Sequence, residues 1–225
     1  MHVAIDGPAG AGKSTVAQIL ARRLNLVYID TGAMYRALTW KAIQLRISLE
    51  NSDKLCELAM TTKIHFEPLQ GQQRILCDNI DISEQIRMPD INNQVSILAS
   101  HSELRLIMVN KQQQLAEQRS VVMDGRDVGE CILPHADYKF YLTATLEVRS
   151  LRRCQEMKQK GFEADIEAVR ILLQQRDESD SKRKTGALKI LNDAVVIDAS
   201  AMNTEQVVQR ILDYMGEDAN ALPAC

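Results

Sequence analysis

A glycine-rich segment near the start of the chain carries the residue types that bind phosphate. Residues 7–15 read GPAGAGKST, which fits the pattern G-x-x-x-x-G-K-[ST] of a P-loop. Glycines let the backbone wrap closely around a phosphate, and the wrapped N–H groups together with the N-terminus of the following helix attract the anion. The members of this P-loop are Gly7, Pro8, Ala9, Gly10, Ala11, Gly12, Lys13, Ser14 and Thr15.

Two side chains of the P-loop extend its chemistry beyond the backbone. Lys13 can reach the β- and γ-phosphates of a nucleotide as a point charge. The hydroxyl of Ser14 suits Mg²⁺, a hard cation that prefers oxygen ligands. The segment therefore predicts binding of a nucleoside triphosphate with Mg²⁺, and it leaves open what becomes of the phosphate.

Two consecutive strand–helix units position the P-loop. The apolar run 2–6 predicts a strand, and apolar residues at helical spacing over 13–24 predict the helix that follows the loop. Residues 27–30 predict a second strand and 33–47 a second helix. A right-handed crossover makes the two strands parallel, so their carboxyl ends meet at the edge of the sheet where ligands bind in open α/β folds.

The middle of the chain interrupts this alternation of strands and helices. Residues 48–62 predict a helix with Asn51 or Ser52 as its N-terminal cap. Short alternating segments then predict a small antiparallel meander, because alternation is typical of strands with one solvated face. Helices that meet near 100–102 are predicted between residues 89 and 119. The meander strands are predicted over 63–67, 74–77 and 79–82, with Gly71 between the first two.

The rest of the chain returns to the α/β pattern. After Thr143 a basic helix runs to its end at Gly161. The remaining elements are strands over 120–125, 137–142 and 195–198, helices over 163–179 and 204–215, and a frayed tail over 216–225. The predicted fold class is α/β, with a P-loop NTPase-type parallel sheet flanked by helices and an insert that contains the antiparallel meander.

Charged clusters follow the predicted strands at the edge where a ligand would bind. They comprise residues 30–36, residues 124–127, the arginines at 149, 152 and 153, and the run 176–184. Taken alone, the two C-terminal clusters are better explained as solvated charged faces. Beside a P-loop, the clusters favour a phosphate clamp, because the planar fork of arginine binds phosphate oxygens. A phosphorylated acceptor is already anionic, so the lack of a nucleophile–histidine pair fits a nucleotide kinase.

Four motifs, in this order, resemble the signatures of the bacterial cytidylate kinase family. They are the P-loop at 7–15, DTGAMYR at 30–36, DGRDVG at 124–129 and RDESD at 176–180, and the similarity spans essentially the whole chain. The resemblance implies transfer of the γ-phosphate of ATP to CMP or dCMP, with Mg²⁺, giving the nucleoside diphosphate and ADP.

The same resemblance implies how the chain is organised. It implies one kinase domain over residues 1–225, built from a core, a nucleoside-monophosphate-binding insert and a short lid. The implied core covers about 1–47, 119–150 and 167–225, the insert about 48–118, and the lid about 151–166. We expect insert and lid to close over both nucleotides, which would exclude water as a competing acceptor.

The resemblance also implies roles for residues at matching positions. Lys13, Arg126 and Arg183 are the implied catalytic residues. ATP would be held by the P-loop and Arg152, with Ser14 as the ligand of Mg²⁺. On the acceptor side, Arg36 and Arg126 with Arg183 would hold the phosphate of CMP, and Thr31 would contact the acceptor. Ser96, Arg105 and Asp127 would read cytosine, and Arg176 and Asp180 would hold the ribose.

The chemistry of the base agrees with this assignment. Cytosine presents an amino donor at N4 and acceptors at N3 and O2, so a carboxylate such as Asp127 can accept from N4. Uracil carries an oxygen instead of the amino group, which would place an acceptor against an acceptor. Such an unpaired buried charge strongly penalises UMP.

Composition narrows the partners further. The chain has 225 residues and a net charge of −3, from 27 basic and 30 acidic residues, which argues against a general nucleic-acid or membrane-surface binder. No signal peptide and no apolar run of the roughly 18 residues that span a membrane are recognised. The scattered cysteines, Cys225 among them, lack a C-x-x-C pair and indicate free thiols in a reducing compartment. We expect a cytoplasmic monomer whose partners are ATP, CMP and dCMP.

Other interpretations differ in the acceptor or in the class of protein. A P-loop kinase for UMP and CMP together, or for a hydroxylated metabolite, is not cleanly separated by the motif DTG at 30–32. A nucleotide-binding switch with slow hydrolysis would lack acceptor-dependent turnover, and the arginine-rich acceptor side disfavours it. An RNA-binding module is disfavoured by the net charge and by an aromatic content of 4%, which provides few stacking platforms.

Overall fold

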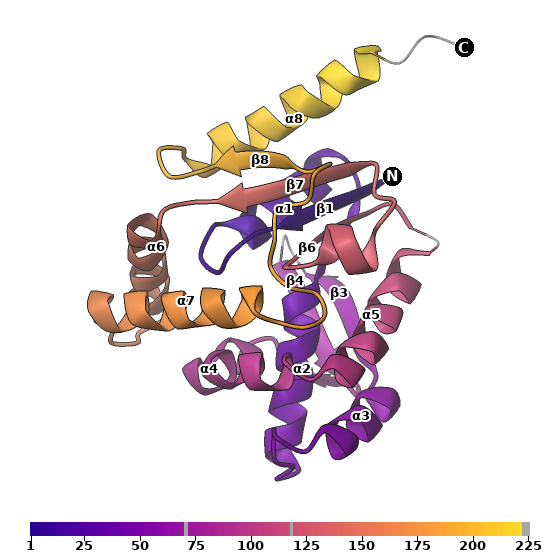
Figure 1. The fold of residues 1–225 in the computed structure, drawn as a ribbon, viewed down its shortest axis with the longest axis vertical. Helices are drawn as coiled ribbons and strands as arrows, with labels where there is room; N and C mark the ends of the chain where they lie inside the picture. The colour runs from indigo at the N-terminus through magenta and orange to yellow at the C-terminus, as the bar shows by residue number, and fades with distance from the viewer. Residues whose placement is uncertain (70–71, 118, 222–225) are drawn as a thin grey trace.

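The computed structural model describes residues 1–69, 72–117 and 119–221. The predicted turn at Gly71 and the thiol of Cys225 lie outside the described residues. Figure 1 shows a mixed sheet-and-helix core, with a second group of helices and strands gathered at one end of it. In the part of the chain that is described, no helix combines the length and the apolar composition needed to cross a membrane.

A five-stranded parallel sheet forms the centre of the core and confirms the predicted fold class. Its strands lie in the order β2-β6-β1-β7-β8, and every neighbouring pair is parallel. Asp6 pairs in register with Gly125, and Asp30 pairs with Asp124, so the strand ends that carry chemistry meet at one edge. The strands are β1 His2–Asp6, β2 Val27–Asp30, β6 Val121–Gly125, β7 Tyr138–Thr143 and β8 Val195–Asp198.

Apolar side chains cover both faces of this sheet, as a parallel sheet requires. On one face, Val3 and Ile5 of β1 pack with two helices, α1 (Lys13–Arg23) and α8 (Thr204–Ala221). On the other face, Ala4 packs with residues of β6 and of a π-helical turn, η2 (Val128–Ile132). The alternation of β1 between two apolar clusters fixes the rotation of the strand that leads into the P-loop.

The insert packs on α2 (Thr31–Gln44) and has its own core. Met34 and Leu38 of α2 lie in one buried cluster with Leu55, Val95 and Leu104 of the insert. Its strands form the predicted antiparallel meander in the order β3-β4-β5. The insert comprises α3 Ser52–Thr61, β3 Ile64–Leu69, β4 Gln72–Cys77, β5 Ile80–Asp81, η1 Gln85–Arg87, α4 Pro89–Leu98 and α5 Ser102–Ala116.

Two helices, α6 (Leu146–Gln159) and α7 (Ile166–Ser181), cross near the P-loop (Figure 1). Cys154 of α6 and Leu173 of α7 form a small buried cluster with Ala9 of the P-loop. This cluster is what holds the arginine-bearing faces of both helices beside the phosphate-binding segment.

Several predicted boundaries differ from the structure for local reasons. Helix α2 begins at Thr31 and not at residue 33, because the carboxylate of Asp30 accepts from the N–H of Ala33 and caps it. Helix α3 begins at Ser52 and not at residue 48, with Asn51 as its cap. Helix α8 continues to Ala221 although a frayed tail was expected from residue 216. The π-helical turn at 128–132 was not predicted.

Candidate active site

The P-loop joins β1 to α1, and its path requires glycine. Gly10 and Gly12 have φ angles of 77° and 98°, in the left-handed region that disfavours a side chain. A Cβ atom at Gly7 would lie 2.0 Å from the carbonyl oxygen of Leu142 on β7. No side chain caps α1 at Gly12, so its first N–H groups remain available to an anion.

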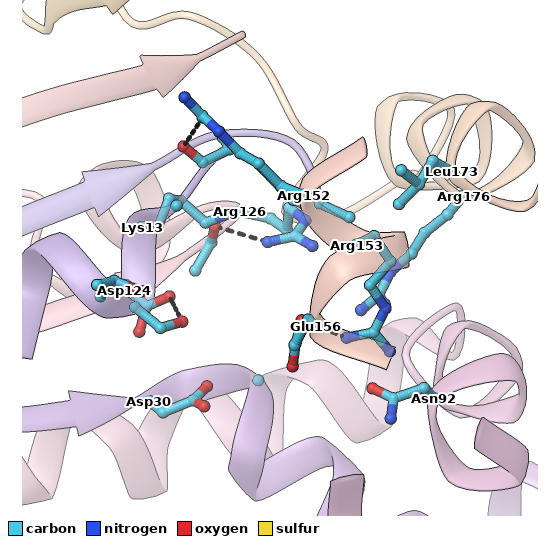
Figure 2. Close-up of a pocket in the computed structure, with 18 of the residues that line it drawn as sticks. Lys13, Asp30, Asn92, Asp124, Arg126, Arg152, Arg153, Glu156, Leu173 and Arg176 are labelled. Atoms are coloured by element: carbon cyan, nitrogen blue, oxygen red, sulfur yellow. Dashed lines mark hydrogen bonds and ion pairs between the residues drawn. The ribbon is translucent and has the colours of Figure 1, made fainter. Parts of the chain in front are cut away.

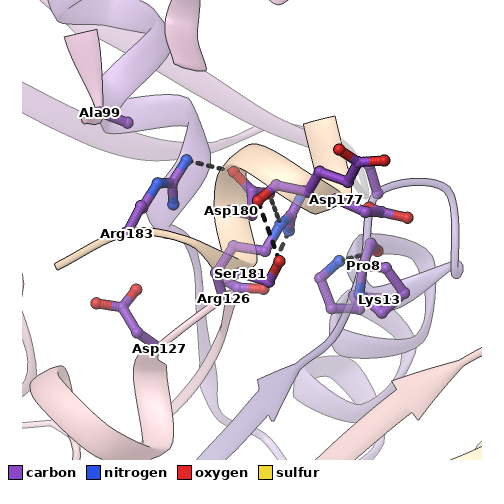
Figure 3. A network of polar contacts seen from close by, with 12 residues as sticks. Pro8, Lys13, Ala99, Arg126, Asp127, Asp177, Asp180, Ser181 and Arg183 are labelled. Carbon is purple, nitrogen blue, oxygen red and sulfur yellow. Dashed lines mark hydrogen bonds and ion pairs between the residues drawn. The ribbon is translucent and has the colours of Figure 1, made fainter. Parts of the chain in front are cut away.

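Lys13 is the cation of the P-loop, with 5% of its surface exposed. Its Nζ atom donates a hydrogen bond to the carbonyl oxygen of Pro8 at 2.8 Å (Figure 3). Burial lowers the pKa of Lys13 to about 7, and repulsion from Arg126 adds to this effect, while Asp124 opposes it. A bound phosphate would supply the negative charge that a buried ammonium group needs.

Ser14 and Asp124 form an oxygen-rich corner beside Lys13. The Ser14 hydroxyl donates to Oδ2 of Asp124 at 2.8 Å, and the Tyr28 hydroxyl donates to Oδ1 at 2.8 Å. Burial raises the pKa of Asp124 to about 6, and repulsion from Asp30 raises it further. A hydroxyl and a carboxylate that carries uncompensated charge fit Mg²⁺, which takes one or two carboxylates and completes its shell with water and phosphate oxygens. Among the described residues there is no cluster of three His, Cys, Asp or Glu side chains that could bind a metal alone.

Three arginines and one carboxylate form the centre of the predicted acceptor side, and Figure 3 shows two of these arginines, Arg126 and Arg183, beside Asp180. Asp180 of α7 is fully buried, accepts from Nε of Arg126 at 2.7 Å and also pairs with Arg183. Although burial alone would raise it, Arg126 and Arg183 lower the pKa of Asp180 below its usual value. Burial, followed by repulsion from Arg126, lowers the pKa of Arg176 to about 9. This excess of buried cations over carboxylates describes a site for an anion.

Arg36 and Thr31 come from the first turns of α2. Arg36 pairs with Asp30 at 2.7 Å, so the same carboxylate caps α2 and orients the arginine. The Thr31 hydroxyl donates to the backbone carbonyl of Asp124 at 2.7 Å, which ties α2 to the neighbouring strand β6. Both side chains therefore face the edge of the sheet where the P-loop lies.

Arg105 and Asp127 meet at the far end of the acceptor side. Nη2 of Arg105 lies 2.5 Å from Oδ2 of Asp127, and the two side chains are 2% and 7% exposed. The guanidinium carbon of Arg105 lies 5.4 Å from the ring centroid of Tyr35, a cation–π contact that fixes its plane. Nε of Arg105 and the Tyr35 hydroxyl are buried without hydrogen-bond partners in the described part of the chain. Buried groups of this kind are usually satisfied by a ligand or by water.

One cavity of about 880 Å³ connects these groups (Figure 2). Gly7 and Pro8 of the P-loop do not line it. The predicted site residues that do line it are Ala9, Gly10, Ala11, Gly12, Lys13, Ser14, Thr15, Thr31, Arg36, Ser96, Arg105, Arg126, Asp127, Arg152, Arg176, Asp180 and Arg183. The structure thus gathers positions from seven separate segments around a single space.

The basic helix α6 places its arginines in different environments. Arg149 is buried and binds the carbonyl oxygens of Ala9 at 3.1 Å and Ala144 at 2.9 Å, and it pairs with Asp177 at 2.6 Å. It therefore supports the P-loop from outside the cavity. Arg152 lines the cavity and donates to the carbonyl of Ala199 at 2.7 Å.

Sequence patterns gave no indication of some residues that build the site. Tyr28 supports Asp124 from the neighbouring strand, a contact that depends on the strand order β2-β6. Glu156 of α6 also lines the cavity, where it pairs at 2.8 Å with Arg153 of the predicted basic cluster (Figure 2). A buried tyrosine within a short strand is an ordinary core residue in sequence, so only the strand order reveals its role.

Comparison with solved structures agrees with the fold. A gluconokinase from Sinorhizobium meliloti superposes with a TM-score of 0.50 at 15% identity, covering 98% of this chain and 94% of that one. An uncharacterized protein from Eubacterium ventriosum gives a TM-score of 0.52 at 14% identity, covering 96% and 98%. With a P-loop at the edge of its parallel sheet, the protein falls in the class of P-loop α/β folds.

Comparison with sequences gives the family. The sequence model of the cytidylate kinase family matches residues 3–217. A cytidylate kinase from Bacillus cereus is 44% identical over 215 residues, which cover 96% of each chain, and one from Bacillus cytotoxicus is 45% identical over 217 residues, again 96% of each. The chain belongs to the cytidylate kinase family.

Proposed function

We propose that this cavity holds ATP over the P-loop and CMP or dCMP among the arginines, so that the two nucleotides meet between Lys13 and Arg126. The reaction is transfer of the γ-phosphate of ATP to CMP or dCMP, which yields ADP and CDP or dCDP. One observation carries the assignment of residues. A single cavity is lined by the phosphate-binding Lys13 at one end and by the Arg105–Asp127 pair at the other.

At the donor end, backbone N–H groups of residues 7–15 would hold the β- and γ-phosphates, and Arg152 would border the nucleotide. Ser14, with Asp124, would hold Mg²⁺. When bound, this ion would neutralise charge on the phosphate oxygens. Lys13 would place its ammonium group against the transferring phosphoryl group, and its surroundings already favour an anion there.

At the acceptor end, Arg36, Arg126 and Arg183 would hold the phosphate of the monophosphate. Arg176 and Asp180 would hold the ribose, and Thr31 would contact the acceptor near its phosphate. Support comes from the carboxylate partners Asp30 and Asp180, which hold Arg36, Arg126 and Arg183 in place. Arginines that are already oriented lose less conformational freedom when they bind phosphate.

The base would be read by Ser96, Arg105 and Asp127. The Asp127 carboxylate can accept from the N4 amino group of cytosine, and Arg105 and Ser96 can donate to N3 and O2. The burial of the Arg105–Asp127 pair makes this recognition stringent, because an unmatched acceptor on uracil would face a buried carboxylate.

The chemical step needs no general base from the protein. An oxygen of the CMP phosphate, already anionic, attacks the γ-phosphorus, and the bond from that phosphorus to the β,γ-bridging oxygen breaks as ADP leaves. Lys13, Arg126 and Arg183 would stabilise the negative charge spread over the transferring group. Positioning and charge stabilisation therefore account for the catalytic groups present.

We also propose the division of the single domain into a core over about 1–47, 119–150 and 167–225, an insert over about 48–118 and a lid over about 151–166. The insert shares with α2 an apolar cluster distinct from those of the central sheet, and α6 and α7 form another with Ala9, which supports this division. Closure of insert and lid over both nucleotides should reduce the radius of gyration measured by small-angle scattering, and unchanged dimensions would contradict it. A monomeric state and a cytoplasmic location stay predictions from the sequence.

The decisive experiment measures ADP production from Mg·ATP with CMP, dCMP, UMP, AMP and GMP in parallel. We expect strong turnover with CMP and dCMP and weak turnover with UMP. In Asp127→Ala, the preference for CMP over UMP should fall, while an exposed control variant such as Asp53→Ala should keep it. Release of ADP that is indifferent to every monophosphate would contradict the assigned reaction.

A further inference from the structure

Asp6, the last residue of β1, directly precedes the P-loop, and only 6% of its surface is exposed. Both of its carboxylate oxygens are used. Oδ1 accepts a hydrogen bond from the backbone N–H of Val128 at 2.8 Å, and Oδ2 accepts one from the N–H of Gly129 at 2.8 Å. These residues begin the π-helical turn η2 directly after Asp127. A side chain of β1 therefore fixes the start of a turn that follows the neighbouring strand β6.

Asp127 occupies the position from which a side chain ordinarily caps such a turn. The first N–H groups of a helical segment have no partners within it, and an aspartate at the N-cap usually accepts from them. Asp127 makes no such bond. Its carboxylate pairs with Arg105 at 2.5 Å instead. The cap is supplied from another strand, by Asp6.

We infer that Asp6 is a positioning residue for base recognition: by capping η2 from β1, it leaves the carboxylate of Asp127 free to pair with Arg105 and to face the base. This role rests on the proposed function, in which Arg105 and Asp127 read cytosine. Without Asp6, the N–H groups of Val128 and Gly129 would be buried without acceptors, which is costly. From the N-cap position, the carboxylate of Asp127 can accept from the second N–H of the turn, that of Gly129, and to do so it would turn away from Arg105.

The packing around the turn leaves little room for its backbone to move when the Asp6 cap is lost. A Cβ atom at Gly125 would lie 2.5 Å from Oγ1 of Thr31, and one at Gly129 would lie 3.2 Å from Cδ1 of Leu191. Val128 and Ile132 of the turn are buried in the core. Because the backbone is held so closely, the side chain of Asp127, and not the backbone, changes its orientation when the cap is lost.

The test compares kcat/KM for CMP with kcat/KM for UMP in wild type, Asp6→Asn, Asp127→Ala and the double variant. Asparagine matches aspartate in shape, but its NH₂ group donates, so it can cap at most one of the two N–H groups. We expect Asp6→Asn to lower the ratio of CMP to UMP by about tenfold or more, mainly through a higher KM for CMP. In the Asp127→Ala background it should lower the ratio no further, because the residue through which it acts is gone.

A core variant separates this effect from a general loss of stability. Val208 on α8 is fully buried and lies in the apolar cluster of the core, so Val208→Ala should weaken the fold and leave the ratio unchanged. If Asp6→Asn does not fold, Asp6→Ser takes its place, because its small side chain leaves space for water to bond the two N–H groups. The ratio of kcat/KM for CMP to kcat/KM for UMP, measured in the Asp6→Ser variants, then tests the inference.

The outcomes distinguish two failures. If Asp127→Ala lowers the ratio and the Asp6 variant does not, the positioning role of Asp6 is wrong and the proposed function stands. If Asp127→Ala leaves the ratio unchanged, Asp127 does not read the base, and the role of Asp6 falls with that assignment. A further drop caused by Asp6→Asn in the Asp127→Ala background would also overturn the inference, since Asp6 would then act through another group.

Discussion

The two ends of the cavity present phosphate-binding groups by different means. The phosphate-binding part of the donor end is one contiguous segment, residues 7–15, in which backbone N–H groups and a helix N-terminus provide the anion site. The acceptor end is assembled from side chains of α2, α4, α5 and α7 and of the segments after β6 and α7. A backbone site keeps its shape through glycine conformation, whereas a side-chain site needs partners that hold each arginine.

Those partners are visible at the acceptor end. Arg36 pairs with Asp30, Arg105 with Asp127, and Arg126 with Asp180. At the donor end, Lys13 forms no salt bridge to any described residue and contacts the carbonyl of Pro8. The carboxylates at the acceptor end lower the cost of burying several cations together, and they fix the arginine planes before a substrate arrives. The donor end relies on its ligand for that charge.

The largest expected effect is a loss of kcat in a variant that changes the donor end alone. Lys13→Ala removes the cation that faces the transferring group, so kcat should fall by about 10³-fold. Because the acceptor end is untouched, the preference for CMP over UMP should remain that of the wild type. Steady-state kinetics with both acceptors measure this, with the exposed Lys54→Ala as the matched control. A loss of base preference in Lys13→Ala would mean that the two ends are not separable.

A smaller effect, on stability, belongs to the acceptor end. Asp180→Ala leaves Arg126 and Arg183 buried without their carboxylate, which should lower the free energy of unfolding by about 3–5 kcal/mol. Sulfate should restore more stability to this variant than to the wild type, because the anion substitutes for the missing charge. Denaturant titrations with and without sulfate test both statements.

An exposed ion pair provides the control for Asp180→Ala. Glu167 pairs with Arg170 on the surface of α7 at 2.9 Å, with side chains 64% and 39% exposed. Glu167→Ala should change the free energy of unfolding by less than about 1 kcal/mol. Equal losses in the two variants would show that the acceptor arginines do not depend on their carboxylate.

The same contrast explains how much could be predicted from sequence. The P-loop is contiguous, so its residues and its conformation could be predicted together. For the acceptor end, the parallel strand order places the predicted residues in one cavity, but the pairing of Arg105 with Asp127 depends on the tertiary fold. Arg149 shows the limit most clearly, because a buried arginine that binds backbone carbonyls has the same sequence signal as one that faces a phosphate.

The predicted helix boundaries were wrong where a polar side chain caps the helix at a position that the spacing of apolar residues does not indicate. Asp30 closes β2 and caps α2 at once, so α2 begins earlier than its apolar spacing indicates. The π-helical turn at 128–132 has no periodic signal of its own, and its cap comes from Asp6, far away in the sequence. Local propensity cannot report a cap that a different strand supplies.

The smallest expected effect is a pH dependence of the free energy of unfolding that arises from Asp6. This residue lies between the two ends of the cavity, because it precedes the P-loop and bonds the turn that follows Asp127. Burial is the largest influence on Asp6 and raises its pKa to about 6. The hydrogen bonds from Gly129 and Val128 lower this pKa, the charge of Asp127 raises it, and the charge of Lys13 lowers it. Because this pKa is above its unfolded value of 3.8, the native state binds the proton more tightly. The stability that the protonated side chain contributes is therefore complete below about pH 4 and is lost as the pH rises through about 6, an effect of order 1–3 kcal/mol.

Urea denaturation of wild type and Asp6→Asn at pH 5, 6 and 7 isolates this contribution, because the other titrating groups are common to both proteins. The difference in free energy of unfolding, wild type minus variant, should decrease as the pH rises across this range. The facing groups Lys13 and Asp127 remain in both proteins, so the slope belongs to Asp6 and to its interaction with them. A difference that stays constant from pH 5 to 7 would show that the two N–H bonds outweigh burial and keep Asp6 ionised throughout. Asp6 would then remain a carboxylate from pH 5 to 7, and its two hydrogen bonds to the turn that follows Asp127 would stabilise the fold equally at each pH.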